Sequence, residues 1–88
     1  DGFVIISATV DKHNGKLIGE PEIITRGFIY MRDADDLTKQ MKNTITQVIN
    51  NGSSKNGNRK DKVQDSISRM LFNETKRRPM VFSIIHEK

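Results

Sequence analysis

The sequence predicts an α/β (α+β) two-layer sandwich, in which two helices cover one face of a three-stranded mixed sheet. Three observations predict it. The chain has 88 residues, which suits one hydrophobic core. Apolar, β-branched runs stand near both ends of the chain, as strands require. Two central segments repeat apolar residues at helical spacing, so that each has one apolar stripe. The predicted order is β-β-α-α-β, in a single domain over residues 1–88.

The first predicted strand covers residues 3–10, where seven of the eight side chains are aromatic, β-branched or alanine. Residues 11–16 then connect it to a second strand. Within this connection Asn14 and Gly15 are expected to supply the positive φ angles that a tight hairpin needs.

The second predicted strand covers residues 17–25. Pro21 has no backbone N–H to donate, so this strand is expected at an edge of the sheet, with a bulge near Gly19. The next segment, residues 26–31, has two open interpretations. It either extends the strand or forms a turn into the first helix.

Asp33 is expected to cap the first helix, and Asp35 and Asp36 place negative charge in its first turn. Asn51 and Gly52 are expected to end it, because glycine tolerates the left-handed conformation of a helix cap. The apolar stripe of this helix consists of Leu37, Met41, Ile45, Val48 and Ile49.

Residues 50–58 are polar and rich in turn formers, which predicts a flexible loop between the helices. The second helix is expected to begin near Arg59 and to be stopped by Pro79, and the last strand covers residues 80–85. The apolar stripe of the second helix consists of Val63, Ile67, Met70 and Leu71.

The simplest sheet places the first strand in the centre and the last strand parallel to it. Two helices can cover only one face of such a sheet, and both faces of its strands carry apolar residues. We therefore expect an apolar face that seeks a partner, although a partly solvated face is the alternative. The sequence leaves open which face the helices cover. The candidate residues for self-association are Phe3, Ile5, Val81 and Ile85.

The net charge of +4 is concentrated in residues 55–78, which hold eight basic and three acidic residues. Such a segment is compatible with RNA contact, and also with an ordinary solvated helix. The chain has no cysteine, which fits a reducing cytoplasm. No apolar run approaches the roughly 20 residues that span a bilayer. We therefore expect a soluble, cytoplasmic domain without membrane contact.

No catalytic or metal-binding motif is visible. His13 and His86 form no metal-ligand pair with each other or with a neighbouring histidine. Asp33, Asp35 and Asp36 resemble a site for a hard cation, but a helix start already explains them. No glycine-rich phosphate loop and no base next to a nucleophile appear. We expect no catalytic residue and no metal or other cofactor in this domain.

Two groups of residues are candidates for contact with RNA or with an acidic partner. Arg26 precedes Phe28, and together they could stack on a base, although Phe28 also suits the core. The second group can meet phosphates, or it can simply complement the dipole of the second helix. It consists of Lys76, Arg77 and Arg78.

Two segments carry a resemblance to a known family. Residues 21–32 (Pro-Glu-Ile-Ile-Thr-Arg-Gly-Phe-Ile-Tyr-Met-Arg) resemble a family segment of the form pD-I-I-S-R-G-F-V-Y-M-R. Residues 74–80 (Glu-Thr-Lys-Arg-Arg-Pro-Met) resemble its closing K-T-K-R-R-P-M signature. The chain thus resembles the C-terminal domain of bacterial ribonuclease J over essentially all its length, except that residues 50–58 show no family pattern.

The resemblance implies an enzyme whose catalysis lies in other domains. Ribonuclease J combines a metallo-β-lactamase domain with a β-CASP domain, where zinc or manganese ions activate water against a phosphodiester. The family degrades RNA from the 5′ end and also cuts internally, in mRNA decay and rRNA maturation. None of its His-x-His-x-Asp-His metal residues lies in this chain. The resemblance implies a domain that assembles the enzyme into dimers or tetramers; an RNA-binding module that delivers substrate is the alternative.

Overall fold

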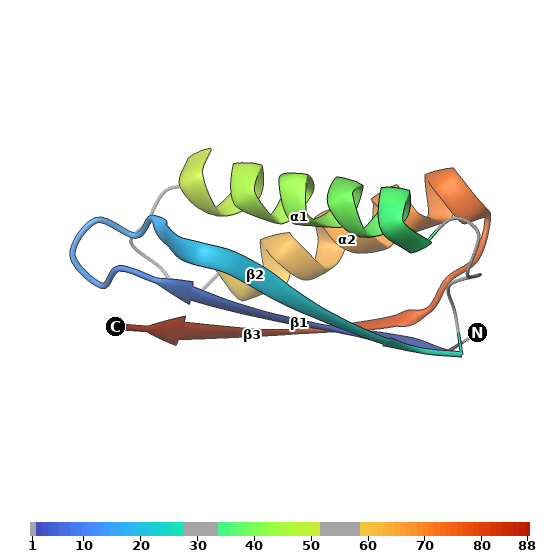
Figure 1. Cartoon of the computed structure of the whole chain (residues 1–88), viewed down its shortest axis with the longest axis horizontal. Coiled ribbons are helices and arrows are strands. Elements are labelled where there is room, and N and C mark those ends of the chain that lie inside the picture. Colours follow the sequence, from blue (N-terminus) through green and yellow to red (C-terminus); the bar gives the residue numbers. More distant parts are fainter. Residues whose placement is uncertain (1, 28–33, 52–58) are drawn as a thin grey trace.

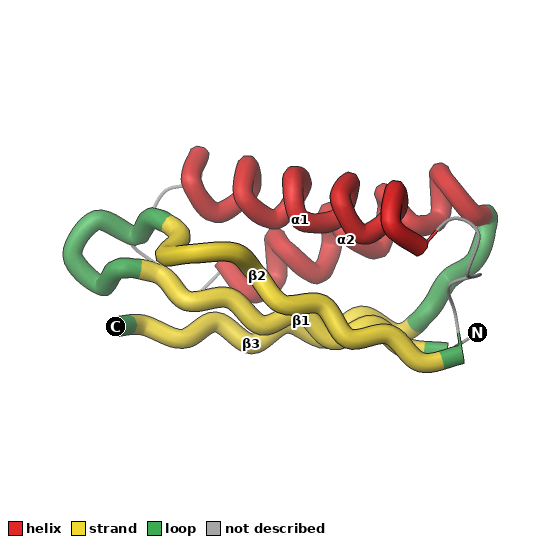
Figure 2. The backbone as a smooth tube through the Cα atoms, in the orientation of Figure 1, coloured by secondary structure: helices red, strands yellow, loops and turns green. Residues whose placement is uncertain are grey.

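The computed structural model describes residues 2–27, 34–51 and 59–88. Its elements follow the predicted order, and the two helices lie side by side over one face of the sheet (Figures 1 and 2). The predicted two-layer fold is confirmed. The elements are β1 (Phe3–Val10), β2 (Leu17–Arg26), α1 (Ala34–Asn51), α2 (Arg59–Thr75) and β3 (Met80–Glu87).

The sheet has the strand order β2-β1-β3. β1 pairs with β2 in the antiparallel sense and with β3 in the parallel sense, as predicted. The register between β1 and β2 shifts after Ser7, which pairs with Glu22, because Thr9 pairs with Ile18. The extra residues of β2 in this interval include Gly19, whose φ is 70°. The predicted edge position of β2 and its bulge near Gly19 are therefore confirmed.

The connection between β1 and β2 differs from its prediction in one respect. Gly15 has a positive φ of 73°, but Asn14 does not. Asn14 instead uses its side chain, whose Oδ1 accepts a hydrogen bond of 2.8 Å from the amide of Lys16. Oδ1 of Asp11 accepts backbone hydrogen bonds from His13 at 2.7 Å and from Asn14 at 3.3 Å. These two donors hold the pKa of the Asp11 carboxyl below its ordinary value.

The core lies between the helices and the inner face of the sheet. Both predicted helical stripes are buried there, except that Val48 and Met70 are only partly buried. The buried apolar residues are Val4, Ile6, Ala8 and Val10 of β1, Leu37, Met41, Ile45 and Ile49 of α1, and Val63, Ile67 and Leu71 of α2.

The helix boundaries depart slightly from prediction. α1 continues through Asn51, so the loop predicted from residue 50 began two residues too early. The predicted cap Asp33 and residues 52–58 lie outside the described residues. α2 ends at Thr75, well before Pro79. Lys76 adopts a left-handed φ of 60°. A left-handed residue directly after the last turn terminates a helix by itself, so proline is not what ends α2.

β3 runs two residues further than predicted. Its last residues, His86 and Glu87, pair with Thr9 and Val10. Lys88 then donates a backbone hydrogen bond of 3.0 Å to Val10. Among the described residues, no helix is both long and apolar enough to cross a membrane.

Candidate association surface

The sheet face turned away from the helices is rich in exposed apolar side chains. The register places Phe3 beside Met80, Ile5 beside Phe82, and Ser7 beside Ile84. These residues alternate with the buried ones of β1, so they point away from the core. We call this side of the sheet the outer sheet face. Its apolar residues are Phe3, Ile5, Ile18, Ile24, Met80, Phe82 and Ile84, and all of them except Ile5 are exposed.

Two of the predicted self-association residues lie on this face and two do not. Phe3 and Ile5 belong to the outer sheet face. Val81 and Ile85 lie on the opposite face, packed against the core, because they pair with Val4 and Ala8. Their predicted placement was wrong. Both sides of β3 are apolar in sequence, so alternation alone could not distinguish its inner from its outer residues.

Charged side chains border the apolar part of the outer sheet face on β2. Ile24 pairs with Ile5. Glu22 and Arg26 lie two residues before and two residues after Ile24, on the same face of β2. Both charged side chains are exposed. Arg26 donates from Nη1 to the carbonyl oxygen of Thr25 at 3.1 Å. Neither Glu22 nor Arg26 has an ion-pair partner within the described part of the chain.

The free edge of β3 is closed at its centre by α2. Met80 and Lys88 donate their backbone N–H groups to Gly2 and Val10 on the β1 side, and N–H groups alternate in direction along a strand. The N–H of Ser83 therefore points away from β1, and it donates to Oε1 of Gln64 at 2.9 Å. Ser83 is 3% exposed, and its Oγ lies 2.9 Å from the carbonyl oxygen of Lys60. A further strand cannot pair at this point without displacing Gln64.

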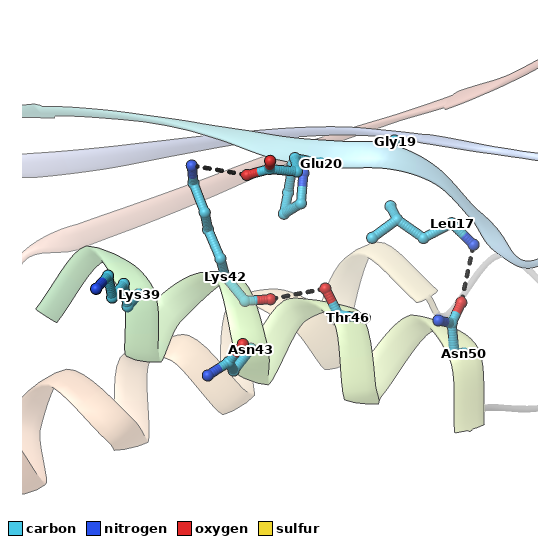
Figure 3. Close-up of a pocket in the computed structure, with 9 residues that line it drawn as sticks. Leu17, Gly19, Glu20, Lys39, Lys42, Asn43, Thr46 and Asn50 are labelled. Carbon is cyan, nitrogen blue, oxygen red and sulfur yellow. Dashed lines mark hydrogen bonds and ion pairs between the residues drawn. The ribbon is translucent and has the colours of Figure 1, made fainter. Parts of the chain in front are cut away.

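The free edge of β2 is closed by other means. The bulge and Pro21 interrupt it, and α1 reaches across to it (Figure 3). Lys42 forms an ion pair of 3.1 Å with Glu20, and Oδ1 of Asn50 accepts a hydrogen bond of 2.8 Å from the amide of Leu17. A cleft of about 420 Å³ lies between these contacts. The side chains of Glu20, Lys42 and Asn50 in its lining thus hold β2 to α1, whereas Lys39 and Asn43 line the cleft without such a contact to the described residues.

A cation–aromatic cluster follows the end of α2. Nζ of Lys76 lies 5.4 Å from the ring centroid of Phe72, and the guanidinium carbon of Arg78 lies 4.5 Å from it. The structure thus brings two of the three predicted basic residues together, while Arg77 is half-buried. A groove of about 400 Å³ adjoins Phe72 and Arg78. Phe72 was not predicted from the sequence, although its position four residues before Lys76 was a usable signal.

The described residues contain no group of three or more His, Cys, Asp or Glu side chains able to hold a metal ion. His13 lies exposed in the connection between β1 and β2, and His86 lies exposed on β3. Asp35 and Asp36 occupy the first turn of α1, where the helix dipole favours them. Phe28, the predicted stacking partner of Arg26, lies outside the described residues.

A family model for the ribonuclease J C-terminal domain matches residues 1–88. This chain belongs to that family. Ribonuclease J 2 of Staphylococcus aureus is 34% identical to it over 91 residues, which cover 99% of the chain and 16% of that protein. Ribonuclease J 2 of Staphylococcus epidermidis matches with the same identity and coverage. This ribonuclease J C-terminal domain therefore spans about a sixth of the length of the curated relatives that it matches.

Proposed function

We propose that this ribonuclease J C-terminal domain is a non-catalytic assembly domain, which brings together copies of a metal-dependent exo- and endoribonuclease of mRNA decay and rRNA maturation. The outer sheet face carries this proposal. Phe82 is 46% exposed, Ile84 48% and Met80 63%, although all three belong to a strand that completes the sheet. The largest apolar patch on the surface of a small domain is often an interaction site.

The size of the face sets the expected strength of association. A strand rises by about 3.3 Å per residue and neighbouring strands lie about 4.8 Å apart, so three strands that pair over about eight residues present roughly 380 Å². A standard interface buries roughly 800 Å² per partner. The domain alone should therefore associate weakly. In a longer chain, contacts between other domains would raise the effective concentration of the two faces and complete the assembly.

The proposed catalytic chemistry lies outside this chain. The described residues offer no set of donors that fits zinc or manganese, so no hydrolytic step is assigned to them. The metal ions belong to the catalytic domain of the proposed parent enzyme. There they would activate water for attack on a phosphodiester.

Sedimentation equilibrium of the chain over a wide range of concentration tests the assembly proposal. We expect a reversible increase of mass with concentration. Phe82→Ser should abolish this increase, because it removes from the outer sheet face an aromatic side chain that lies beside Ile5 of the central strand. Phe72→Ser is the matched control, since Phe72 lies on α2, and it should leave the association intact. A wild-type chain that stays monomeric at every concentration would contradict the proposal.

The cation–aromatic cluster favours a second candidate function, the binding of single-stranded RNA. Lys76 and Arg78 are held on the Phe72 ring and have no carboxylate partner in the described chain. A guanidinium stacked on a ring keeps its N–H donors free for phosphate. Fluorescence anisotropy with a short RNA at several salt concentrations tests this function. The double variant Lys76→Ala, Arg78→Ala should weaken binding and flatten its salt dependence, whereas Phe82→Ser should change neither.

A further inference from the structure

Both edges of the sheet are obstructed, β3 at its centre and β2 around its bulge, and this restricts how two copies can meet. Oε1 of Gln64 accepts the hydrogen bond from the N–H of Ser83 at the centre of the β3 edge. The bulge and Pro21 interrupt the β2 edge, where Lys42 and Glu20 form their ion pair. Continuous edge-to-edge pairing of strands would have to break one of these arrangements. The outer sheet face has no such obstruction, so stacking of two sheets is the favoured contact.

The rows of residues across the outer sheet face define one symmetric arrangement. Ile24, Ile5 and Phe82 form a row that is apolar on all three strands. The row on one side of it contains Arg26 and the row on the other side contains Glu22, both on β2. A two-fold axis that crosses the strands at the apolar row would lay each residue of this row over its own copy. It would also exchange the two neighbouring rows.

This exchange produces complementary charges. With the axis at the apolar row, Arg26 of one copy faces Glu22 of the other, and the symmetry repeats the contact. Met80 then faces Ile84, so apolar surface also meets apolar surface. An axis shifted by one row would place a charged residue over its own copy. Like charges directly opposite one another are destabilising, so the apolar row is the favoured position.

We propose that two copies of this chain stack outer face to outer face about a two-fold axis at the row of Ile24, Ile5 and Phe82, with Arg26 of each copy paired to Glu22 of the other. The proposal rests on the assembly function and adds its partner, its contact surface and its symmetry. Ion pairs at the rim of an interface fix the register more than they add affinity. Arg26 and Glu22 thus select one stacking arrangement, and the apolar row supplies its affinity.

Charge reversal with mixing tests this arrangement. Arg26→Glu places glutamates opposite each other in both symmetric contacts, and Glu22→Arg places arginines opposite each other. Each variant alone should self-associate about tenfold or more weakly than the wild type. When the two variants are mixed, every contact pairs an arginine with a glutamate, so heterodimers should form with near wild-type affinity. The double variant Arg26→Glu, Glu22→Arg should also recover self-association.

The controls separate this proposal from the assembly function. Lys12→Glu in the connection and Glu74→Arg on α2 change the net charge equally but lie off the outer sheet face, so neither should alter self-association, nor should mixing them. Two results would overturn the stacking arrangement, provided that Phe82→Ser still abolishes association. One is that the single charge reversals self-associate like the wild type. The other is that mixing the two variants restores no association. If the wild-type chain never associates, the assembly function fails and the stacking arrangement fails with it.

Discussion

The amide of Ser83 donates a hydrogen bond of 2.9 Å to Oε1 of Gln64, and this contact joins the free edge of β3 to α2. Oγ of Ser83 also lies 3.1 Å from Oε1 of Gln64. β3 is apolar and β-branched, and its centre carries no charge, which makes its edge a template for unwanted pairing. A single glutamine therefore protects the sheet at its most vulnerable point.

Gln64→Leu should lower the free energy of unfolding by about 1–2 kcal/mol, because it leaves the buried N–H of Ser83 without an acceptor. Urea denaturation measures this change. The matched control is Gln47→Leu on the exposed side of α1, which should cost less than about 0.5 kcal/mol. Equal losses in the two variants would show that the Ser83 contact contributes nothing to stability.

Apolar residues of the core and of the outer sheet face should differ sharply in their contribution to folding. Ile67 is completely buried, so Ile67→Ala should cost about 2–5 kcal/mol of unfolding free energy. Ile84 is 48% exposed, and Ile84→Ala should cost less than about 1 kcal/mol. Denaturant unfolding at low protein concentration compares them. A large loss for Ile84→Ala would mean that the outer face serves the fold of the single chain instead of association.

Two glycines with positive φ should respond differently to alanine. A Cβ at Gly2 would lie 2.3 Å from the carbonyl oxygen of Arg26, whereas a Cβ at Gly19 would meet no atom within 4 Å. Gly19→Ala should therefore cost only the left-handed backbone strain, about 1 kcal/mol. Gly2→Ala should cost at least about 2 kcal/mol more, because β1 or β2 must also shift. Thermal unfolding of both variants is the measurement, and the reverse ranking would contradict the structure.

The pKa of Asp11 predicts how its contribution to stability depends on pH. Its backbone hydrogen bonds from His13 and Asn14 keep this pKa below the ordinary value of 3.8. A carboxyl with a lowered folded pKa stabilises the fold above the unfolded pKa, and loses this effect as the pH falls through the folded pKa. Asp11→Ala should therefore be less stable than the wild type at neutral pH, and the difference should shrink below pH 3.8. An NMR titration midpoint of Asp11 at or above 3.8 would contradict this.

Much of the fold could be predicted because its signals are local. The buried stripes of α1 and α2 follow helical spacing, and Pro21 marks β2 as an edge strand through its missing donor. The end of α2 could not be predicted, since a left-handed Lys76 carries no sequence signal comparable to glycine. The positive φ predicted for Asn14 was wrong for a similar reason. Its side chain accepts a hydrogen bond from the amide of Lys16, and its backbone φ is not positive.

The candidate surface was predictable only in part because it depends on pairing between distant strands. Alternation groups Phe3 and Ile5 on one face of β1, but it does not say which face the helices cover. For β3, a shift of one residue in register exchanges its faces, and both faces are apolar. The roles of Val81 and Phe82 therefore became clear only from their pairing with Val4 and Ile5. The protection of Ser83 by Gln64 likewise joins residues from separate elements.

The parallel pairing of β1 with β3 has a consequence for the making of the protein. These strands are separated by nearly the whole domain, so β3 joins the sheet only after every other element has left the ribosome. Met80, Phe82 and Ile84 enter the outer sheet face in that same last step. If this face joins the copies, an unfinished chain lacks the surface that would recruit a second one. Association would then begin only after β3 has been synthesised and has joined the sheet, so only completed domains could enter the assembly.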